Sequence, residues 1–349
     1  MTKELKIKNV KIGNGNKIAI QSMTTTDTAD ANATVEQIKR LENAGCDIVR
    51  ASVYNMDAAR AFKEITAKIN IPLVADVHFD HRLAIAAVEN GADKLRINPG
   101  NITEKKYVQM VVDCAKAHSV PIRIGVNGGS LSPYVKERFG ENSAEALVAS
   151  AMENVAILEK ANFNDICISV KSSNVKKMIK AYELLSKKCD YPLHLGVTEA
   201  GTADIGVVKN AIGMGCLLLQ GIGDTIRVSL TGDPVEEIYA AQNILRSIGM
   251  FNEGVEIISC PMCARTKIPL EKIVQEVKEK TRDVKKPLKV AVMGCVVNGP
   301  GEAKDADIGL AGGGGNGDKA VVFKNGKMLA SGDLSQMKSL LIDEIHNFK

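Results

Sequence analysis

The chain has no tryptophan, and six tyrosines and seven phenylalanines are few for 349 residues. A protein that binds single-stranded nucleic acid needs aromatic side chains on which bases stack, together with a basic surface. Residues 251–349 carry 15 Lys and Arg against 13 Asp and Glu, and the residues before them carry 30 against 28. This balanced composition argues against a nucleic-acid partner.

Long hydrophobic runs are also absent, because no stretch reaches the roughly 18 apolar residues of a membrane helix. The first residues, Met1–Lys6, lack the apolar segment of a signal peptide. We therefore expect no membrane association and a cytoplasmic location. In that reducing compartment the eight cysteines serve as thiols or metal ligands.

The length fits a barrel of roughly 250 residues followed by a second domain of roughly 100. From Ile18 to Ile248, short β-rich runs alternate with amphipathic helical patterns, and several helices end on glycine, as at Gly45 and Gly91. The eight predicted strands are 18–23, 47–52, 72–79, 94–98, 122–127, 166–173, 193–199 and 225–230. Eight βα units predict an α/β fold, a (β/α)8 TIM barrel over residues 1–250, with a doubly wound sheet as the alternative.

Alternation along the strands predicts which side chains point into the barrel. In Ile122–Asn127 the apolar residues share one face, while Arg123 and Asn127 share the other. The apolar face must meet the surrounding helices, so the polar face points inward. The same alternation turns further polar residues inward: Arg50, Ser52, Asp76, His78, Arg96, Asn98, Ser169, Lys171, Ser173, Arg227 and Ser229, with Gln21, Thr198 and Glu199 near the rim.

Five cations in one cavity predict an anionic ligand. Two like charges about 8 Å apart repel by about 2 kcal/mol at an effective dielectric constant near 20. Asp76 and Glu199 offset only part of this repulsion. A diphosphate held by bidentate guanidinium contacts at the C-terminal mouth of the barrel would relieve it. The alternative is that each cation is a solvated edge residue, which requires five coincidences.

Residues 251–349 are predicted to form a small α+β domain that carries a metal site. Cys260 and Cys263 form a Cys-x-x-Cys pair, and Cys295 follows the next predicted strand. Turn-forming residues at 298–301 can fold Glu302 back toward the same centre. The remaining cysteines occur singly and are expected to be buried small hydrophobes: Cys46, Cys114, Cys167, Cys189 and Cys216.

Two metals remain open for this donor set. A structural zinc site uses four closed ligands, usually Cys and His, and His346 is the one histidine of this domain. A [4Fe–4S] cluster takes thiolates, and three cysteines leave one iron free or held by another group. An oxygen ligand such as Glu302 suits that iron poorly and exchanges readily, which favours chemistry on a bound substrate. Glu302 as a plain surface carboxylate is the other possibility.

Several motifs together resemble the hydroxymethylbutenyl diphosphate synthases of the methylerythritol phosphate route to isoprenoids. The motifs extend over the whole chain and show no departure from the family pattern. The absence of a large insert between the two domains is similar to the bacterial two-domain form. The motifs are Gln21-Ser22-Met23-Thr24, Val74–Phe79, Leu95–Gly100, Ile226–Leu230, Cys260-Pro261-Met262-Cys263 and Met293–Glu302.

The resemblance implies a [4Fe–4S] cluster held by Cys260, Cys263, Cys295 and Glu302. It implies reductive ring opening of methylerythritol cyclodiphosphate to hydroxymethylbutenyl diphosphate, with electrons from flavodoxin or ferredoxin. It also places Thr198 and Glu199 near the reacting carbons. The diphosphate would be bound by Arg50, Arg96, Arg123, Asn127, Lys171, Arg227 and Ser229, and alternation adds Asp76, His78 and Asn98.

The order of elements also predicts a head-to-tail homodimer. The helix expected at residues 235–248 returns to the barrel floor, and the linker at 249–254 is short. The second domain therefore starts far from the mouth of its own barrel, and we expect it to cover the mouth of a partner's barrel. The rival function is a barrel hydrolase or aldolase that acts on a phosphorylated substrate and carries a structural zinc site.

Overall fold

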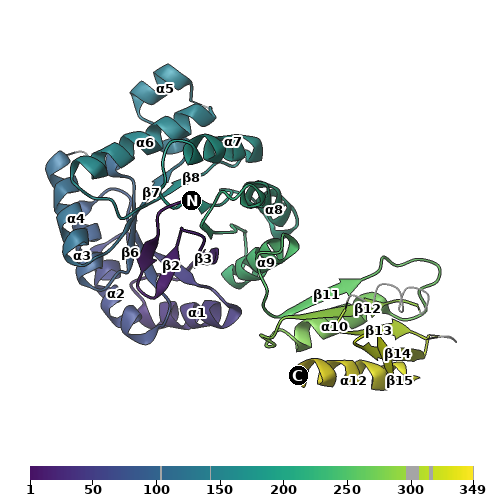
Figure 1. Ribbon diagram of the computed structural model, residues 1–349. Coiled ribbons are helices and arrows are strands. Elements are labelled where there is room, and N and C mark those ends of the chain that lie inside the picture. Colours follow the sequence, from purple (N-terminus) through teal and green to yellow (C-terminus); the bar gives the residue numbers. More distant parts are fainter. Residues whose placement is uncertain (103, 142, 296–305, 314–316, 349) are drawn as a thin grey trace. The chain divides into compact units, whose positions relative to one another are not determined.

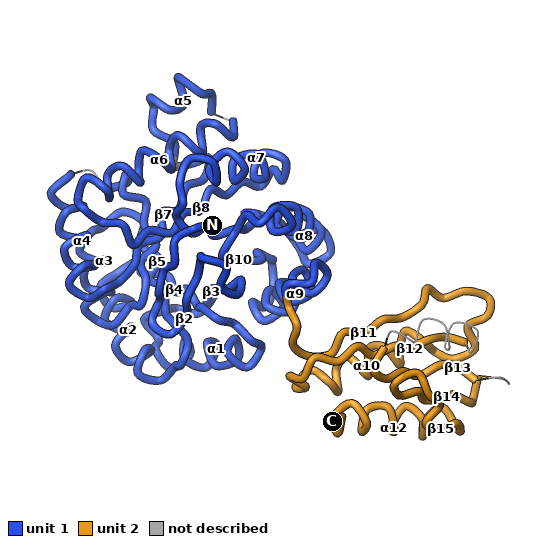
Figure 2. The backbone as a smooth tube through the Cα atoms, in the orientation of Figure 1, with its two compact units in different colours: residues 1–250 blue, residues 251–349 orange. Residues whose placement is uncertain are grey.

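The computed structural model describes residues 1–102, 104–141, 143–295, 306–313 and 317–348. The chain divides into two compact units, Met1–Met250 and Phe251–Lys349 (Figure 2). Within the described residues, no helix combines the length and apolar character needed to cross a membrane.

The first unit is a closed barrel of eight parallel strands surrounded by helices (Figure 1). The hydrogen-bonded order runs β8-β7-β6-β5-β4-β3-β10-β9, and a parallel bridge from Ile168 to Leu193 closes the ring. This closure confirms the TIM barrel and excludes the doubly wound sheet. The strands are β3 (Ala19–Met23), β4 (Ile48–Ser52), β5 (Leu73–Asp76), β6 (Lys94–Ile97), β7 (Ile122–Val126), β8 (Ile166–Val170), β9 (His194–Leu195) and β10 (Thr225–Ile226).

Eight long helices cover the outside of the barrel. They begin at side-chain caps in most cases, as where Asp30 accepts a hydrogen bond from Ala33 N. They are α1 (Ala31–Ala44), α2 (Met56–Lys68), α3 (His81–Glu89), α4 (Lys105–Ala117), α6 (Ala144–Lys160), α7 (Val175–Ser186), α8 (Ala203–Leu219) and α9 (Pro234–Ser247). The pattern did not predict α5 (Pro133–Phe139) or the 3-10 turns η1 (Pro99–Asn101) and η2 (Gly128–Ser130).

Strands β9 and β10 are shorter than the sequence predicts, with two residues each instead of seven and six. The backbone leaves the regular ladder after Leu195 and Ile226, although Arg227 N still donates to Leu195 O at 3.0 Å. Glu199 has a left-handed φ of 52° that a strand does not allow. The polar residues expected at these strand ends therefore lie on loops at the barrel mouth.

An N-terminal hairpin, absent from the sequence prediction, seals the other end of the barrel. Its strands β1 (Leu5–Ile7) and β2 (Val10–Ile12) pair antiparallel. Leu5, Ile7 and Ile12 pack in one buried cluster with Ile48 and Val74, which lie near the N-terminal ends of β4 and β5. The barrel floor is therefore apolar and closed.

The described residues of the second unit form a five-stranded sheet with two helices. Strands β11, β12 and β13 are parallel, and β13, β14 and β15 are antiparallel. Helices α10 and α12 bury Ile273 and Leu341 against strand residues such as Val290. The elements are β11 (Val255–Ser259), α10 (Leu270–Lys280), β12 (Leu288–Met293), β13 (Ile308–Gly312), β14 (Lys319–Lys324), β15 (Lys327–Asp333) and α12 (Leu334–His346).

Candidate active site

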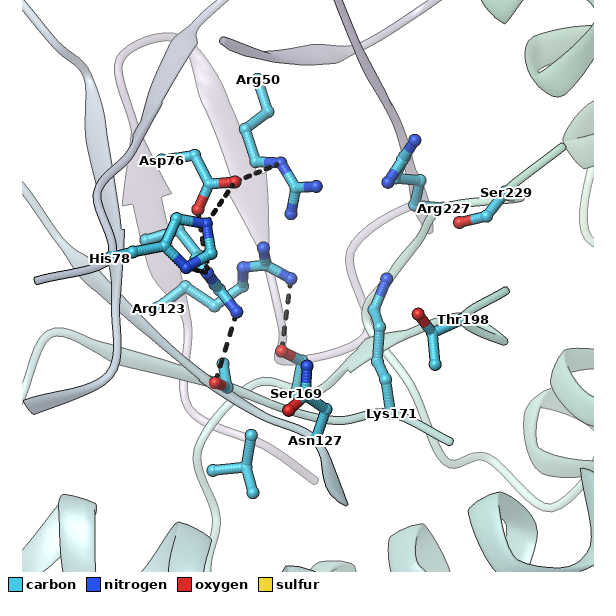
Figure 3. A pocket seen from close by; sticks show the side chains of 13 residues that line it. Arg50, Asp76, His78, Arg123, Asn127, Ser169, Lys171, Thr198, Arg227 and Ser229 are labelled. Carbon is cyan, nitrogen blue, oxygen red and sulfur yellow. Dashed lines mark hydrogen bonds and ion pairs between the residues drawn. The ribbon is translucent and has the colours of Figure 1, made fainter. Parts of the chain in front are cut away.

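A cavity of about 230 Å³ lies where the barrel strands end at the mouth (Figure 3). It collects the five cations that strand alternation turned inward. Most of the other predicted substrate-binding residues line it as well. The lining is Arg50, Asp76, His78, Arg96, Arg123, Gly125, Val126, Asn127, Ser169, Lys171, Thr198, Arg227 and Ser229.

Asp76 is the buried anion at one side of this cavity. Its carboxylate lies 3.1 Å from Arg96 Nη1 and 3.6 Å from Arg50 Nε. Burial alone would raise the pKa of Asp76, but the charge of Arg50, the hydrogen bond from His78 and the charge of Arg96 outweigh it and hold the pKa well below its ordinary value. Asp76 therefore stays ionised and fixes the orientation of two guanidinium groups.

Glu237 of α9 is the second anion, and sequence reasoning missed it. Its carboxylate lies 3.3 Å from Arg227 Nη2 and accepts hydrogen bonds from Ser22 Oγ at 2.9 Å and Leu230 N at 3.1 Å. Sequence reasoning gave this neutralising role to Glu199, which was wrong, because Glu199 is exposed and does not line the cavity. A carboxylate on the buried face of the last barrel helix was the signal for Glu237.

Arg123 and Lys171 face the cavity without a counter-charge. Among the described residues, neither has an acidic side chain within 4.0 Å, and Arg123 donates only to Ser169 Oγ at 3.3 Å. Burial, and then the neighbouring cations, lower the pKa of Arg123 to about 10 and the pKa of Lys171 well below its ordinary value. Five cations against two carboxylates leave an excess of positive charge that an anionic ligand would neutralise.

Two glycines give the cationic side chains room to cross their strands. A Cβ on Gly125 would lie 2.4 Å from Arg96 Nε, and a Cβ on Gly196 would lie 2.8 Å from Lys171 Nζ. Any side chain at these positions would displace the cation. The cavity therefore depends on small residues as well as on charged ones.

Two predicted site residues lie elsewhere than expected. Asn98 was expected to line the cavity, but it caps η1, where its Oδ1 accepts from Gly100 N at 3.2 Å. It lies outside the cavity lining because the chain turns into η1 directly after β6. Glu199 follows the lining residue Thr198, and its left-handed backbone is a strain that functional sites often hold.

The second unit brings the predicted cysteine loops to one sheet edge. Cys260 follows β11 and Cys295 follows β12, which is its parallel neighbour. Gly294 N donates to Cys260 Sγ at 3.3 Å, so the two loops are in contact. Glu302 lies outside the described residues, and within the described residues no three His, Cys, Asp or Glu side chains form a metal-binding group. The ligand set therefore stays a prediction.

The chemistry around these thiols fits a thiolate-bound metal cluster. All three cysteines are free, and Arg265 lies beside them. Backbone and side-chain hydrogen bonds from Arg265 lower the pKa of the Cys263 thiol. Its hydrogen bond to Cys263 and the charges of Cys263 and Cys295 raise the pKa of Arg265 in turn. Such donors stabilise thiolates and the anionic clusters that thiolates hold.

The other five cysteines follow their expected burial only in part. Cys46 and Cys167 are buried, and Cys114 and Cys189 are partly buried. Cys216 was also expected to be buried, which was wrong, because it is exposed on the outer face of α8. The apolar pattern of α8 continues around the helix, so its periodicity did not separate the buried face from the exposed one.

Each of the two units matches a known family model. The family model described as GcpE TIM-barrel domain matches residues 2–242, and the model described as GcpE protein C-terminal domain matches residues 256–347. The chain belongs to the GcpE family. The two models cover the unit with the cation cavity and the unit with the cysteine loops, and both describe parts of the same protein family.

Relatives of this GcpE-family chain share most of its length. A protein of Caldanaerobacter subterraneus subsp. tengcongensis is 60% identical over 94% of this chain and 92% of its own. A protein of Clostridium perfringens is 57% identical over 94% of this chain and 93% of its own. Both are named 4-hydroxy-3-methylbut-2-en-1-yl diphosphate synthase (flavodoxin).

The barrel of this GcpE-family chain also resembles solved structures of other proteins. The dihydropteroate synthase of Yersinia pestis superposes with a TM-score of 0.51 at 10% identity, covering 71% of this chain and 100% of its own. At this identity the similarity concerns the fold alone.

Proposed function

We propose that this chain reductively opens 2-C-methyl-D-erythritol 2,4-cyclodiphosphate to 4-hydroxy-3-methylbut-2-en-1-yl diphosphate. The reaction takes up two electrons and releases water. The relatives' names support this activity. The observation that carries it is the cavity whose five cations pair, among the described residues, with only two carboxylates, Asp76 and Glu237. A cyclic diphosphate supplies the negative charge that the cavity lacks.

The paired and unpaired cations have different roles in this proposal. Arg50 and Arg96 are oriented by Asp76, and Arg227 is oriented by Glu237. Oriented guanidinium groups bind phosphate oxygens in a bidentate manner. Arg123 and Lys171 have no acidic partner among the described residues, so they are open to bind the diphosphate directly.

Polar side chains complete the proposed substrate site. Asn127 and Ser229 line the cavity beside the cations and offer neutral hydrogen bonds to the substrate. Thr198 and Glu199 follow the short strand β9 and would lie near the carbon atoms that react. His78 lies at the opening, 3.7 Å from Asp76, and would complete the wall of the site.

The second unit is proposed to hold a [4Fe–4S] cluster through Cys260, Cys263, Cys295 and Glu302. Such a cluster supplies single electrons and an iron that accepts oxygen ligands. Within the chain, Gly294 N stabilises Cys260, and Arg265 stabilises Cys263. We further propose flavodoxin or ferredoxin as the electron donor and the cytoplasm as the location, because thiolate ligands and such donors require a reducing compartment.

The activity test is reduction of the cyclodiphosphate by the anaerobically purified protein with a reduced flavodoxin. We expect product formation, bound iron and sulfide, and broad visible absorption that bleaches on reduction. The rival barrel hydrolase or aldolase with structural zinc predicts a colourless protein with stoichiometric zinc and no reductive activity. Zinc in place of iron and sulfide would refute the proposed mechanism.

We also propose the head-to-tail homodimer. An apolar stripe on the outer face of α8 supports an interface between two copies, because Ile205, Val208, Ile212 and Leu219 are 47 to 69% exposed. Stripes of this size on a barrel surface mark interaction sites. Mixing an Arg123→Ala chain with a Cys295→Ser chain tests the shared site, and recovered activity is the expected result. No recovery, with the mixed dimer shown by mass spectrometry, would contradict it.

A further inference from the structure

A second polar layer lies inside the barrel, beneath the cation cavity. Lys94 stands two residues before Arg96 on β6, so both side chains point inward and Lys94 lies about 7 Å deeper. Its side chain is fully buried. The same step of two residues places the buried Cys167 of β8 beneath Ser169. Gln21 of β3 is buried in this layer as well, because it pairs with Ile48, two residues before Arg50; it does not lie near the rim, where it was expected. His194 of β9 is the next buried polar residue.

This inner layer contains polar atoms that the described residues do not satisfy. Lys94 Nζ, both amide atoms of Gln21 and His194 Nε2 have no hydrogen-bond partner among those residues. His194 Nδ1 contacts Thr225 Oγ1 at 2.7 Å. Barrel interiors are ordinarily filled by bulky apolar side chains, and ordered water is the usual partner of buried polar groups. An amine buried without a counter-charge is most stable when it is neutral.

The charged and titratable groups around Lys94 offer it almost no negative charge. Arg123 on β7 and Arg50 on β4 place positive charge near Lys94, Cys167 on β8 is the neighbouring thiol, and Lys94 in turn acts on His194 of β9. Among the described residues that line the cavity above, Asp76 on β5 is the one carboxylate, and Arg50 and Arg96 already occupy it. Burial, and then the charges of Arg123 and Arg50, lower the pKa of Lys94 to about 8.

We propose that Lys94 takes up a proton when an anion fills the cation cavity. The bound diphosphate supplies the negative charge that the interior lacks. Above pH 8, where the buried amine of the free protein is largely neutral, it therefore becomes an ammonium ion, with the proton drawn from the solvent. This inference rests on the proposed function, because it requires a diphosphate in the cavity. When the ligand leaves, the proton returns to the solvent. Lys94 thereby adjusts the charge of the barrel interior to the occupancy of the site.

Calorimetry with inorganic pyrophosphate tests this coupling. The anaerobically purified full-length protein is titrated at pH 8.5 in two buffers of different ionisation enthalpy, and the difference in heat gives the number of protons taken up. With the pKa of Lys94 at about 8, we expect the wild type to take up ~0.7 proton more per bound pyrophosphate than Lys94→Met. Lys180→Met removes an exposed lysine of α7 and should behave like the wild type.

Each outcome of the calorimetry decides a separate point. Pyrophosphate that binds with equal proton uptake in the wild type and in Lys94→Met overturns the coupling but leaves the proposed function intact. No binding to the wild type overturns both. Lys94→Gln is the second variant and should match Lys94→Met. If neither variant folds, the wild type alone decides: proton uptake on pyrophosphate binding that does not rise between pH 6.5 and pH 8.5 overturns the coupling, because Lys94 is already protonated at the lower pH.

Discussion

The interiors of the two units are built in opposite ways. In the part of the chain that the structure describes, Arg123 and Lys171 face the barrel cavity without acidic partners, whereas Val290, Val292 and Leu310 of the second unit lie in a continuous apolar core. A buried unpaired charge lowers stability, while a buried aliphatic side chain raises it by about 1.5–3 kcal/mol. The barrel thus keeps its binding groups inside, at a cost to stability, and the second unit keeps its cysteines on a loop edge.

Replacing Arg123 with methionine should give the largest effect. Loss of a buried guanidinium that binds the diphosphate should reduce kcat/KM by about a thousandfold, or about 4 kcal/mol. The same change removes an unpaired buried charge, so stability should stay equal or rise by about 1–4 kcal/mol. Steady-state kinetics and urea unfolding measure the two quantities. Arg60→Met, on the exposed face of α2, is the control; a strong loss of stability in Arg123→Met would contradict the comparison.

Asp76→Asn should have the opposite effect on the barrel. The isosteric amide leaves Arg50 and Arg96 without their carboxylate, and we expect a loss of about 3–5 kcal/mol in the free energy of unfolding. Because the pKa of Asp76 is lowered, its contribution is fully present above its ordinary pKa and disappears as the pH falls below it. Urea unfolding at pH 7 and at acidic pH checks this, and equal stabilities at pH 7 would refute it.

The lowered pKa of Lys94 predicts that the free energy of unfolding rises with pH. Its pKa is about 8 in the folded chain against an ordinary value of 10.5. Below pH 8 both states hold the proton, so the folded state bears the full cost of the buried charge. Between pH 8 and 10.5 the unfolded state binds more protons, and stability should rise by about 3 kcal/mol in total. Urea unfolding over this range measures the rise, which should be smaller by this amount in Lys94→Met, because the lowered pKa values of Lys171 and Arg123 still contribute there. An equal rise in the variant would contradict the prediction.

Val290→Ala should cause the smallest loss of stability, and this loss should be confined to the second unit. The side chain is fully buried in the sheet core, and the lost methyl groups should lower the stability of that unit by about 2 kcal/mol. Pyrophosphate affinity should not change, because no cavity-lining residue belongs to this core. Calorimetry of unfolding measures the stability, and calorimetry of binding measures the pyrophosphate affinity. Weaker pyrophosphate binding in Val290→Ala would contradict the prediction, because it would show that the core of the second unit affects the barrel site.

The sequence predicted the barrel and its cavity because both follow from periodicity. Alternation along a strand determines on which side Arg50, Arg96 and Arg123 lie, and the structure brings them together. Alternation turns Lys94 inward as well, two residues before Arg96, but it does not show that the amine is fully buried without a hydrogen-bond partner among the described residues.

Alternation along the strands does not predict contacts between segments that are distant in the sequence. Glu237 lies on a helix that packs beside Ser22 and Arg227, and the alternation was applied only to strand residues. Asn98 satisfied the alternation, but a local hydrogen bond to Gly100 turned the chain away from the cavity. Arg265 follows the cysteine pair by two residues, and its contact with Cys263 depends on how that loop folds.

The hairpin of β1 and β2 determines how molecules exchange with the barrel. Because Leu5, Ile7 and Ile12 seal the floor, the cavity communicates with solvent through the mouth alone. The substrate must then enter through the same opening through which the product and displaced water leave. An anionic inhibitor bound among the cations of the mouth would therefore occupy the route by which substrate enters as well as the site where it binds.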